Sequence, residues 1–317
     1  MKFDGVININ KPEGMTSHDV VSKVRRKLGI KRVGHSGTLD PMATGVLPVC
    51  VGNATRIIEY YDPDFKVYVA EMKLGIVTDT YDISGEILKE SSFTEQMIID
   101  LPKAVSSFTG FINQYPPKYS AVRVGGRRLY EYARSGDEVE IPSRRVFISY
   151  IDILSVDAEK GLVKMEICCS KGTYIRSIIY DIGEKLGCGA TMTYLCRTGS
   201  GCFEIYDSID LNILLEMSEE QICGLVKPAG ETLAGYAGIE LAQGRVKAFR
   251  DGMSTSPKFY RLTSESDFAK DPRFSQDERL EELSKCYLVY SEGSFLGLGS
   301  IGDDNELRAV KVIYAGN

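Results

Sequence analysis

The stretch GHSGTLDP, residues 34–41, lies in a glycine-rich segment that extends to Gly45 and precedes the apolar run Val46–Val51. Proline disfavours the helical conformation in the residue before it, so Asp40 is expected in an extended or turn conformation on a loop. The glycines around Asp40 permit tight turns or a close approach of the backbone to a ligand. These residues alone leave three interpretations of the carboxylate open: a nucleophile, a general base, or a hydrogen-bonded corner of a turn.

The neighbouring His35 and Ser36 do not predict a serine hydrolase. Adjacent residues on a loop rarely face each other, the sequence contains no G-x-S-x-G motif, and the only other histidine is His18. Taken alone, His35 is typical of a hydrogen-bonding partner rather than of a catalyst.

Helix and strand patterns surround this loop. Residues 16–19 are typical of a helix N-terminus, and apolar residues then recur at helical spacing as far as Gly29. Two more helices are predicted at Tyr174–Leu186 and Leu211–Glu220. Strands are predicted at Val6–Ile9, Lys66–Leu74, Val146–Val156 and Leu162–Cys169.

The pattern changes after Pro228. Ile239–Gly252 predicts a short amphipathic helix, and a polar, acid-rich stretch follows. Three further strands are predicted at Cys286–Tyr290, Phe295–Leu298 and Ala309–Tyr314. Because 317 residues are about twice the length of a typical domain, we expect two domains, at residues 1–227 and 228–317.

Composition and charge exclude several classes of protein. With 43% hydrophobic and 26% charged residues, the chain is neither disordered nor a coiled coil. Asp4 and Asn8 interrupt the apolar core that a signal peptide needs, and no later stretch has the roughly 20 apolar residues that span a bilayer. The eight cysteines include no C-x-x-C pair and there are only two histidines, so no metal site is expected. The sequence therefore predicts a cytoplasmic protein with reduced thiols and no membrane segment.

The net charge of −6 argues against a protein that coats nucleic acid by bulk attraction. Two segments nevertheless carry a basic surplus: residues 1–60 contain nine Lys/Arg and five acids, and residues 114–145 contain seven and four. One interpretation is a shared basic face that grips a polyanion; the other is that these side chains are scattered and solvated.

Several motifs follow one another within the first 225 residues. They are NKPxGMTS at 10–17, GHSGTLDPMATGVLP at 34–48, GxATR at 52–56, KxY at 66–68, TDT at 78–80, PPxYSA at 116–121, CSKGTYIR at 169–176 and LxRT at 195–198. In this order they resemble the TruB family of tRNA pseudouridine-55 synthases. The resemblance implies an α/β (α+β) fold, with a pseudouridine-synthase catalytic domain built on a mixed, mainly antiparallel sheet. It also implies a small β-barrel-like PUA module that binds RNA after that domain.

The resemblance implies a reaction without metal or cofactor, in which a monomer detaches uracil from its ribose, rotates it and reattaches it through carbon. The implied substrate is uridine 55 in the T arm of tRNA. The essential carboxylate is then Asp40, either as a nucleophile at the ribose C1′ or as a base at C2′. Arg176 pairs with Asp40, and Tyr68 stacks on the base once it has been flipped out of the RNA.

The resemblance also assigns residues around the base. His35, Tyr174 and Leu195 are implied near the uracil, although Tyr174 and Leu195 alone would be interpreted as core residues. Lys11 is implied either in contact with RNA or in a structural role.

Two other functions stay open: an RNA-binding or RNA-chaperone protein without turnover, and an RNA-guided pseudouridine synthase like the archaeal and eukaryotic relatives. The presence of Asp40, Tyr68 and Arg176 argues against the first. The bacterial-type MATGVLP at residues 42–48 favours a stand-alone enzyme over the second.

Overall fold

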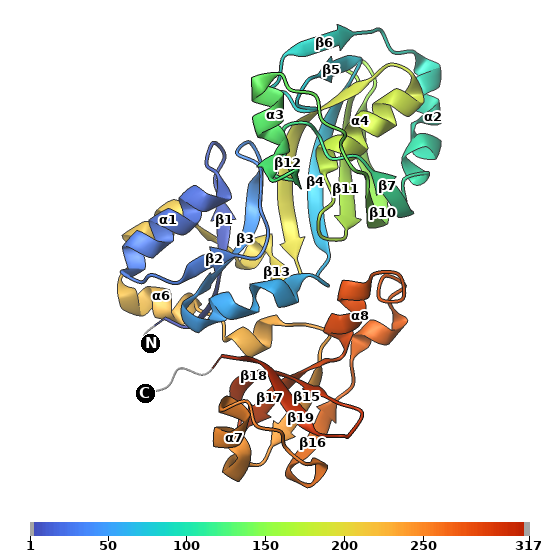
Figure 1. Cartoon of the computed structure of the whole chain (residues 1–317). Helices are drawn as coiled ribbons and strands as arrows, with labels where there is room; N and C mark the ends of the chain where they lie inside the picture. Colours follow the sequence, from blue (N-terminus) through green and yellow to red (C-terminus); the bar gives the residue numbers. More distant parts are fainter. Residues whose placement is uncertain (1–2, 314–317) are drawn as a thin grey trace. The chain divides into compact units, whose positions relative to one another are not determined.

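The computed structural model describes residues 3–313, which divide into two compact units (Figure 1). The first unit contains residues 3–40, 46–64 and 200–313, and the second contains residues 41–45 and 65–199. The chain thus passes between the units at four peptide bonds, the first of which joins Asp40 to Pro41. The boundary predicted between residues 227 and 228 lies within the first unit and stays a prediction.

The first part of the first unit is a small sheet covered by helix α1 (Ser17–Leu28). Strand β1 (Gly5–Lys11) pairs in parallel with β14 (Ile209–Asp210) and neighbours β3 (Thr44–Val51). The short strand β2 (Val33–His35) pairs antiparallel with β3 as well. The predicted start of α1 is confirmed. The Thr16 hydroxyl accepts from the Asp19 amide, and the Asp19 carboxylate accepts from the Thr16 amide. The apolar face of α1 packs against the sheet in one buried cluster.

The predicted helix Leu211–Glu220 is two helices, α5 (Leu211–Glu216) and α6 (Glu219–Leu225). The break occurs because Ser218 caps a new helix, with its hydroxyl accepting from the Gln221 amide.

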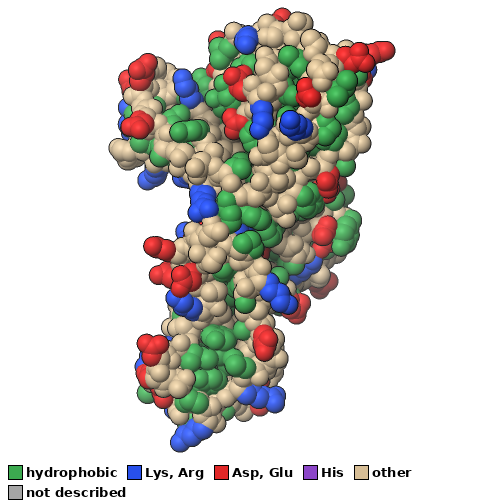
Figure 2. Space-filling view, turned by 90° about the vertical axis from the view of Figure 1, so that its right-hand side faces the viewer, with side chains coloured by type: hydrophobic (Ala, Val, Ile, Leu, Met, Phe, Trp, Pro, Cys, Tyr) green, Lys and Arg blue, Asp and Glu red, His purple; other side chains and the backbone are tan. Residues whose placement is uncertain are grey.

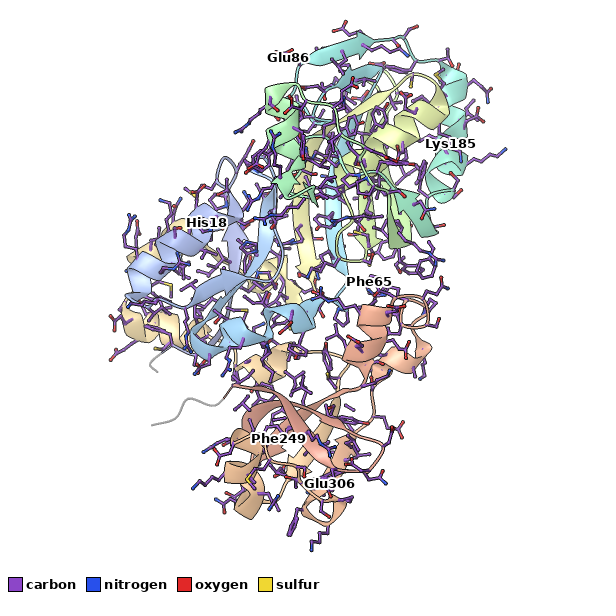
Figure 3. All side chains as sticks on the ribbon, in the orientation of Figure 1. His18, Phe65, Glu86, Lys185, Phe249 and Glu306 are labelled. Carbon is purple, nitrogen blue, oxygen red and sulfur yellow. The ribbon has the colours of Figure 1, made fainter. Side chains whose placement is uncertain are left out.

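The C-terminal part of the first unit contains a five-stranded sheet in the order β16-β15-β17-β18-β19. Its strands are β15 (Ala237–Leu241), β16 (Tyr260–Ser264), β17 (Cys286–Ser291), β18 (Ser294–Ile301) and β19 (Leu307–Val312). The three predicted strands are therefore confirmed, although Tyr314 lies outside the described residues. Phe249 of α7 (Val246–Arg250) is fully buried in the core of this sheet (Figure 3).

The helix predicted over Ile239–Gly252 is wrong in its first part. Ile239 lies in β15, where it pairs with Leu262 of β16 and Val289 of β17. Only Val246–Arg250 is α-helical. The sheet partners of Ile239 lie far along the chain, so a local pattern could not show them.

This C-terminal part shares a hydrophobic core with the 3₁₀ helix η1 (Gly52–Tyr61) of the same unit. Tyr60 and Tyr61 of η1 are both buried. The Tyr236 hydroxyl donates to the Tyr60 carbonyl at 2.9 Å, and the Tyr61 and Thr232 hydroxyls share a hydrogen bond of 2.5 Å. Two ion pairs add to these contacts, Lys311–Glu59 and Arg279–Asp62, each at 2.7 Å.

The second unit is built on a mainly antiparallel sheet in the order β12-β4-β11-β10-β7. Its strands are β4 (Lys66–Leu74), β7 (Gly110–Gln114), β10 (Arg144–Asp157), β11 (Leu162–Cys169) and β12 (Ala190–Ser200). At the β12 edge, Thr44 and Gly45 pair in parallel with Cys196 and Arg197, which confirms the expected mixed, mainly antiparallel sheet.

Helices and two hairpins complete the second unit. The helices are α2 (Glu95–Ser106), α3 (Leu129–Ser135) and α4 (Ile175–Leu186). The hairpins are β5 (Ile76–Thr78) with β6 (Ile87–Glu90), and β8 (Arg123–Val124) with β9 (Arg127–Arg128). The predicted helix Tyr174–Leu186 is confirmed, with Tyr174 as its N-cap.

Acidic and basic side chains lie interspersed on the face shown in Figure 2. Within residues 3–313, no helix is long and apolar enough to cross a membrane.

Candidate active site

The loop that carries Asp40 is anchored to the start of α1. Ser17, the first residue of α1, is 1% exposed. Its hydroxyl accepts from the Leu39 amide at 2.8 Å and donates to the Leu39 carbonyl at 3.2 Å. On the other side of the loop, the Ser36 amide donates to the Pro48 carbonyl. The backbone on either side of this loop is therefore held at Leu39 and at Ser36.

The other predicted residues of the first unit occupy strand ends. His35 is the last residue of β2, lies opposite Val49 and is half-buried. His18 is exposed on α1 (Figure 3). Lys11 ends β1 and is fully buried, and its ammonium donates to the carbonyls of Pro12 and Met15. These bonds support a structural role for Lys11 in the turn before α1, and its contact with substrate stays a prediction.

Arg176 is a buried cation near the N-terminus of α4 in the second unit, with 5% of its side chain exposed. Nη1 donates to the Thr80 carbonyl at 3.0 Å and lies 3.3 Å from Oδ2 of Asp82. Nη2 donates to the Tyr119 carbonyl at 3.3 Å. A buried charge is costly unless it is paired and hydrogen-bonded, and these oxygens hold the guanidinium in one orientation.

Asp82 is itself held in place by its neighbours in sequence. Its Oδ1 accepts from the Thr80 hydroxyl at 2.8 Å, from the Ser84 amide at 3.0 Å and from the Ser84 hydroxyl. Its Oδ2 is left facing Arg176. Sequence analysis did not single out Asp82, although an Asp followed two residues later by Ser is a common side-chain turn.

Gly85 follows Asp82 in this turn, and the space beside it does not admit a side chain. A Cβ at Gly85 would lie 2.3 Å from Oδ1 of Asp79 and 2.3 Å from the Thr80 hydroxyl. Any larger residue would force the Asp79 carboxylate and the Thr80 side chain to shift.

Tyr174 is held by Gln114, a second residue that sequence analysis missed. The Gln114 side chain accepts from the Tyr174 amide at 2.8 Å and donates to its carbonyl at 3.0 Å. Gln114 ends β7 and is 2% exposed. This pair of bonds fixes the entry into α4, two residues before Arg176.

Tyr68 and Leu195 lie on the neighbouring strands β4 and β12 of the second unit, and both are buried. The second unit thus contains Tyr68, Tyr174, Arg176 and Leu195, whereas Lys11, His35 and Asp40 belong to the first. The predicted pairing of Asp40 with Arg176 stays a prediction. No group of three or more His, Cys, Asp or Glu side chains that could hold a metal ion occurs within residues 3–313.

Comparison with known proteins identifies the family. Residues 25–175 match the "TruB family pseudouridylate synthase (N terminal domain)", and residues 176–234 match the "tRNA pseudouridylate synthase B C-terminal domain". A protein of Clostridium kluyveri named tRNA pseudouridine synthase B is 43% identical over 311 residues, covering 98% of this chain and 99% of that protein. This chain belongs to the TruB family.

Other TruB relatives and a solved structure agree. A tRNA pseudouridine synthase B of Clostridioides difficile is 43% identical over 309 residues, covering 96% of this chain and 97% of its own length. The solved "Crystal Structure of a Cbf5-Nop10-Gar1 Complex" contains a chain with a TM-score of 0.71 and 25% identity, covering 99% of this chain and 86% of that one. The family resemblance predicted from the motifs is confirmed, and the small C-terminal sheet fits a PUA-like module.

Proposed function

We propose that this protein isomerises uridine to pseudouridine at position 55 in the T arm of tRNA. Near-full-length relatives named tRNA pseudouridine synthase B, at 43% identity, carry this proposal. Identity to the Cbf5 chain, which was solved in a complex with other proteins, is lower at 25%. This difference favours a stand-alone tRNA enzyme over an RNA-guided one.

In the proposed reaction, Asp40 acts on the ribose as nucleophile at C1′ or base at C2′. The bond from N1 of uracil to C1′ breaks, the base rotates, and a bond from C5 to C1′ forms while C5 loses a proton and N1 gains one. An opposite charge within about 4–6 Å keeps a carboxylate ionised. Arg176, whose guanidinium is already oriented by Thr80, Asp82 and Tyr119, is proposed to supply that charge.

The remaining predicted residues are proposed to receive the base. A uridine inside a folded arm must leave its stack, and an aromatic face then replaces the stacking that is lost. We assign that face to Tyr68 and the surrounding wall to His35, Tyr174 and Leu195. No metal or cofactor is assigned, because the sequence offers two histidines and no C-x-x-C pair. The protein is proposed to act as a cytoplasmic monomer, with its C-terminal part adding contacts to tRNA.

The experiment measures pseudouridine at position 55 in tRNA treated with the wild-type protein or with Asp40→Asn. The amide is nearly isosteric but is neither nucleophilic nor basic, so turnover should be lost while tRNA affinity stays close to wild type. Arg176→Met should also lose turnover, and Arg176→Lys should recover only part of it, because an ammonium lacks the planar two-point grip of a guanidinium.

Two outcomes contradict the proposal. A folded Asp40→Asn variant with near-normal turnover would make Asp40 a structural corner, since asparagine suits such turns. A wild-type protein that binds tRNA but forms no pseudouridine, alone or with guide RNA, would be an RNA-binding protein.

A further inference from the structure

Tyr81 has an unusual backbone conformation at the edge of the Arg176 site. Its φ is +64°, in the left-handed region that non-glycine residues rarely adopt. Such a conformation costs free energy and persists only where surrounding contacts hold it. Tyr81 lies between Thr80, whose carbonyl accepts from Arg176, and Asp82, whose carboxylate pairs with Arg176.

The backbone around Asp82 is tied to strand β12. The Met192 amide donates to the Tyr81 carbonyl at 3.1 Å, and the Ile83 amide donates to the Met192 carbonyl at 2.9 Å. These bonds hold the two residues that flank Asp82 at one point of β12.

The Tyr81 ring supplies a second attachment, to helix α4. It stacks on the Tyr180 ring with 4.1 Å between centroids and 19° between planes. Tyr180 is four residues after Arg176, so both side chains lie on one face of α4 at successive turns. Helix α4 therefore contacts the segment Thr80–Asp82 twice, through the guanidinium and through the stacked ring.

We propose that Tyr81 is a positioning residue: its ring, stacked on Tyr180, holds the Thr80 carbonyl and the Asp82 carboxylate where they orient the Arg176 guanidinium. This inference rests on the proposed function, because the role of Arg176 does. The left-handed φ turns the ring onto α4 while the flanking residues face Arg176. Without the stack, the segment keeps its bonds to Met192 and to the Arg176 guanidinium but loses its second attachment to α4.

The stacking does not require ionisation. Burial, together with Tyr180 and the acidic Asp181 and Glu184, raises the pKa of Tyr81 to about 12. Burial with the same acids raises the pKa of Tyr180 as well. Both rings are therefore neutral near pH 8, and a phenylalanine ring should replace the Tyr81 ring.

The test distinguishes the effect of losing the Tyr81 ring from the effect of changing the backbone conformation at this position. Tyr81→Asn removes the ring but places a residue that tolerates positive φ, so the fold should be retained. Tyr81→Phe keeps the ring, and Tyr180→Leu removes the other half of the stack. Tyr206→Asn is the control, because Tyr206 is 84% exposed and lies in the first unit. Each variant is assayed for single-turnover pseudouridine formation at saturating protein, for tRNA Kd and for Tm.

We expect the single-turnover rate of Tyr81→Asn and Tyr180→Leu to fall roughly ten- to hundredfold, because small misplacements of active-site groups cost this much. Tyr81→Phe and Tyr206→Asn should match the wild type, and Kd should change less than twofold. The double variant Tyr81→Asn with Tyr180→Leu should have about the same single-turnover rate as the slower of the two single variants, because the two rings form one contact.

Two results would overturn the inference. One is a single-turnover rate for Tyr81→Asn within twofold of the wild-type rate. The other is a loss of rate in Tyr81→Asn and Tyr180→Leu that is fully explained by unfolding of the variants, as shown by a lower Tm. If Arg176→Met keeps normal turnover, the role of Arg176 on which this inference rests is wrong; if the wild-type protein binds tRNA but forms no pseudouridine, the proposed function fails instead. The two failures are thus distinguishable.

Discussion

At the scale of single residues, the site in the second unit depends on buried charge. The Arg176 guanidinium and the Asp82 carboxylate are each 5% exposed and lie 3.3 Å apart. Removing one member of a buried ion pair costs more than the intact pair contributes, because the remaining charge stays buried. Asp82 is therefore expected to affect both stability and catalysis.

The first prediction concerns Asp82→Asn. The amide keeps an oxygen for Thr80 and Ser84 but removes the charge beside Arg176. The free energy of unfolding should fall by roughly 3 kcal/mol, and the single-turnover rate should fall at least about tenfold. Urea unfolding and a quenched-flow assay of pseudouridine formation measure the two effects.

The matched control is Asp137→Asn in the same unit. Asp137 pairs with Arg127 at 3.0 Å, but both side chains are about half exposed, at 53% and 47%. An exposed pair contributes little, so neither stability nor rate should change appreciably. Equal effects of the two substitutions would contradict a special role for the buried pair.

The family resemblance pointed to Arg176 and Tyr174 but not to the residues that hold them. Gln114 lies 60 residues before Tyr174, and the Thr80 carbonyl lies 96 residues before Arg176. Contacts over such distances depend on how strands pair, which residue spacing does not reveal. Asp82 was missed for the same reason, because its partner on α4 is far along the chain.

At the scale of elements, the N-terminus of α1 combines two neighbouring hydroxyls with different roles. Thr16 caps the helix, whereas Ser17 holds both backbone groups of Leu39 beside Asp40. Substituting each residue in turn therefore separates the effect of helix capping from the effect of holding the loop that carries Asp40.

The second prediction is that Ser17→Ala lowers the single-turnover rate and that Thr16→Ala does not. Ser17→Ala leaves the buried Leu39 amide and carbonyl without these bonds, at a cost of roughly 1–3 kcal/mol. Thr16→Ala loses only a cap, at about 1 kcal/mol. If the rate falls equally in both variants, the loop is not held by Ser17 in the way described.

The third prediction concerns the pH dependence of stability through α4. Burial, with a smaller contribution from Glu184, raises the pKa of Asp181 to about 6. The folded state therefore binds this proton more tightly than the unfolded state, and the resulting stability is lost as pH rises through about 6. Asp181→Asn should raise the Tm at pH 8, and the advantage should shrink as pH falls towards 4. A constant advantage from pH 4 to pH 8 would contradict this assignment.

Elements with local signals were predicted better than elements without them. Helix α1 begins with a capping box and helix α4 has an apolar face, and both lie where the patterns placed them. Strand β15 buries Ile239 and Leu241, two residues apart as on one face of a strand, and the helix predicted over this stretch forms only at Val246–Arg250. Its pairing with β16 and β17 makes this segment a strand, and the residues of the segment do not show which distant strands will pair with it.

At the scale of the whole molecule, the C-terminal part is joined to the rest of the first unit through a shared core. Residues of η1 and of the C-terminal sheet pack in one cluster, and hydroxyl groups of Tyr61 and Tyr236 bond across it. Removing the C-terminal part would therefore expose apolar surface of the part that remains.

The fourth prediction is that a chain truncated after residue 227 has a much lower Tm than the full chain and binds the dye ANS. Ile57, Tyr60 and Tyr61 would lose the neighbours that bury them. Thermal unfolding and dye fluorescence measure the effect. A truncated chain with the wild-type Tm would show that the shared core contributes little. Tests of RNA binding by this part are therefore better made with surface substitutions in the full chain.

The division of the first unit between distant segments also matters during synthesis on the ribosome. Asn10 of β1 bonds to Asp210 of β14, 200 residues later. At about 5–20 residues per second, β1 waits roughly 10–40 s for this partner. Most of the second unit, residues 65–199, is made in one continuous stretch during that wait. The second unit can thus fold first, while the edge of β1 that pairs with β14 stays open to chaperones or to other nascent chains. Slow codons between residues 65 and 199 would lengthen that exposure.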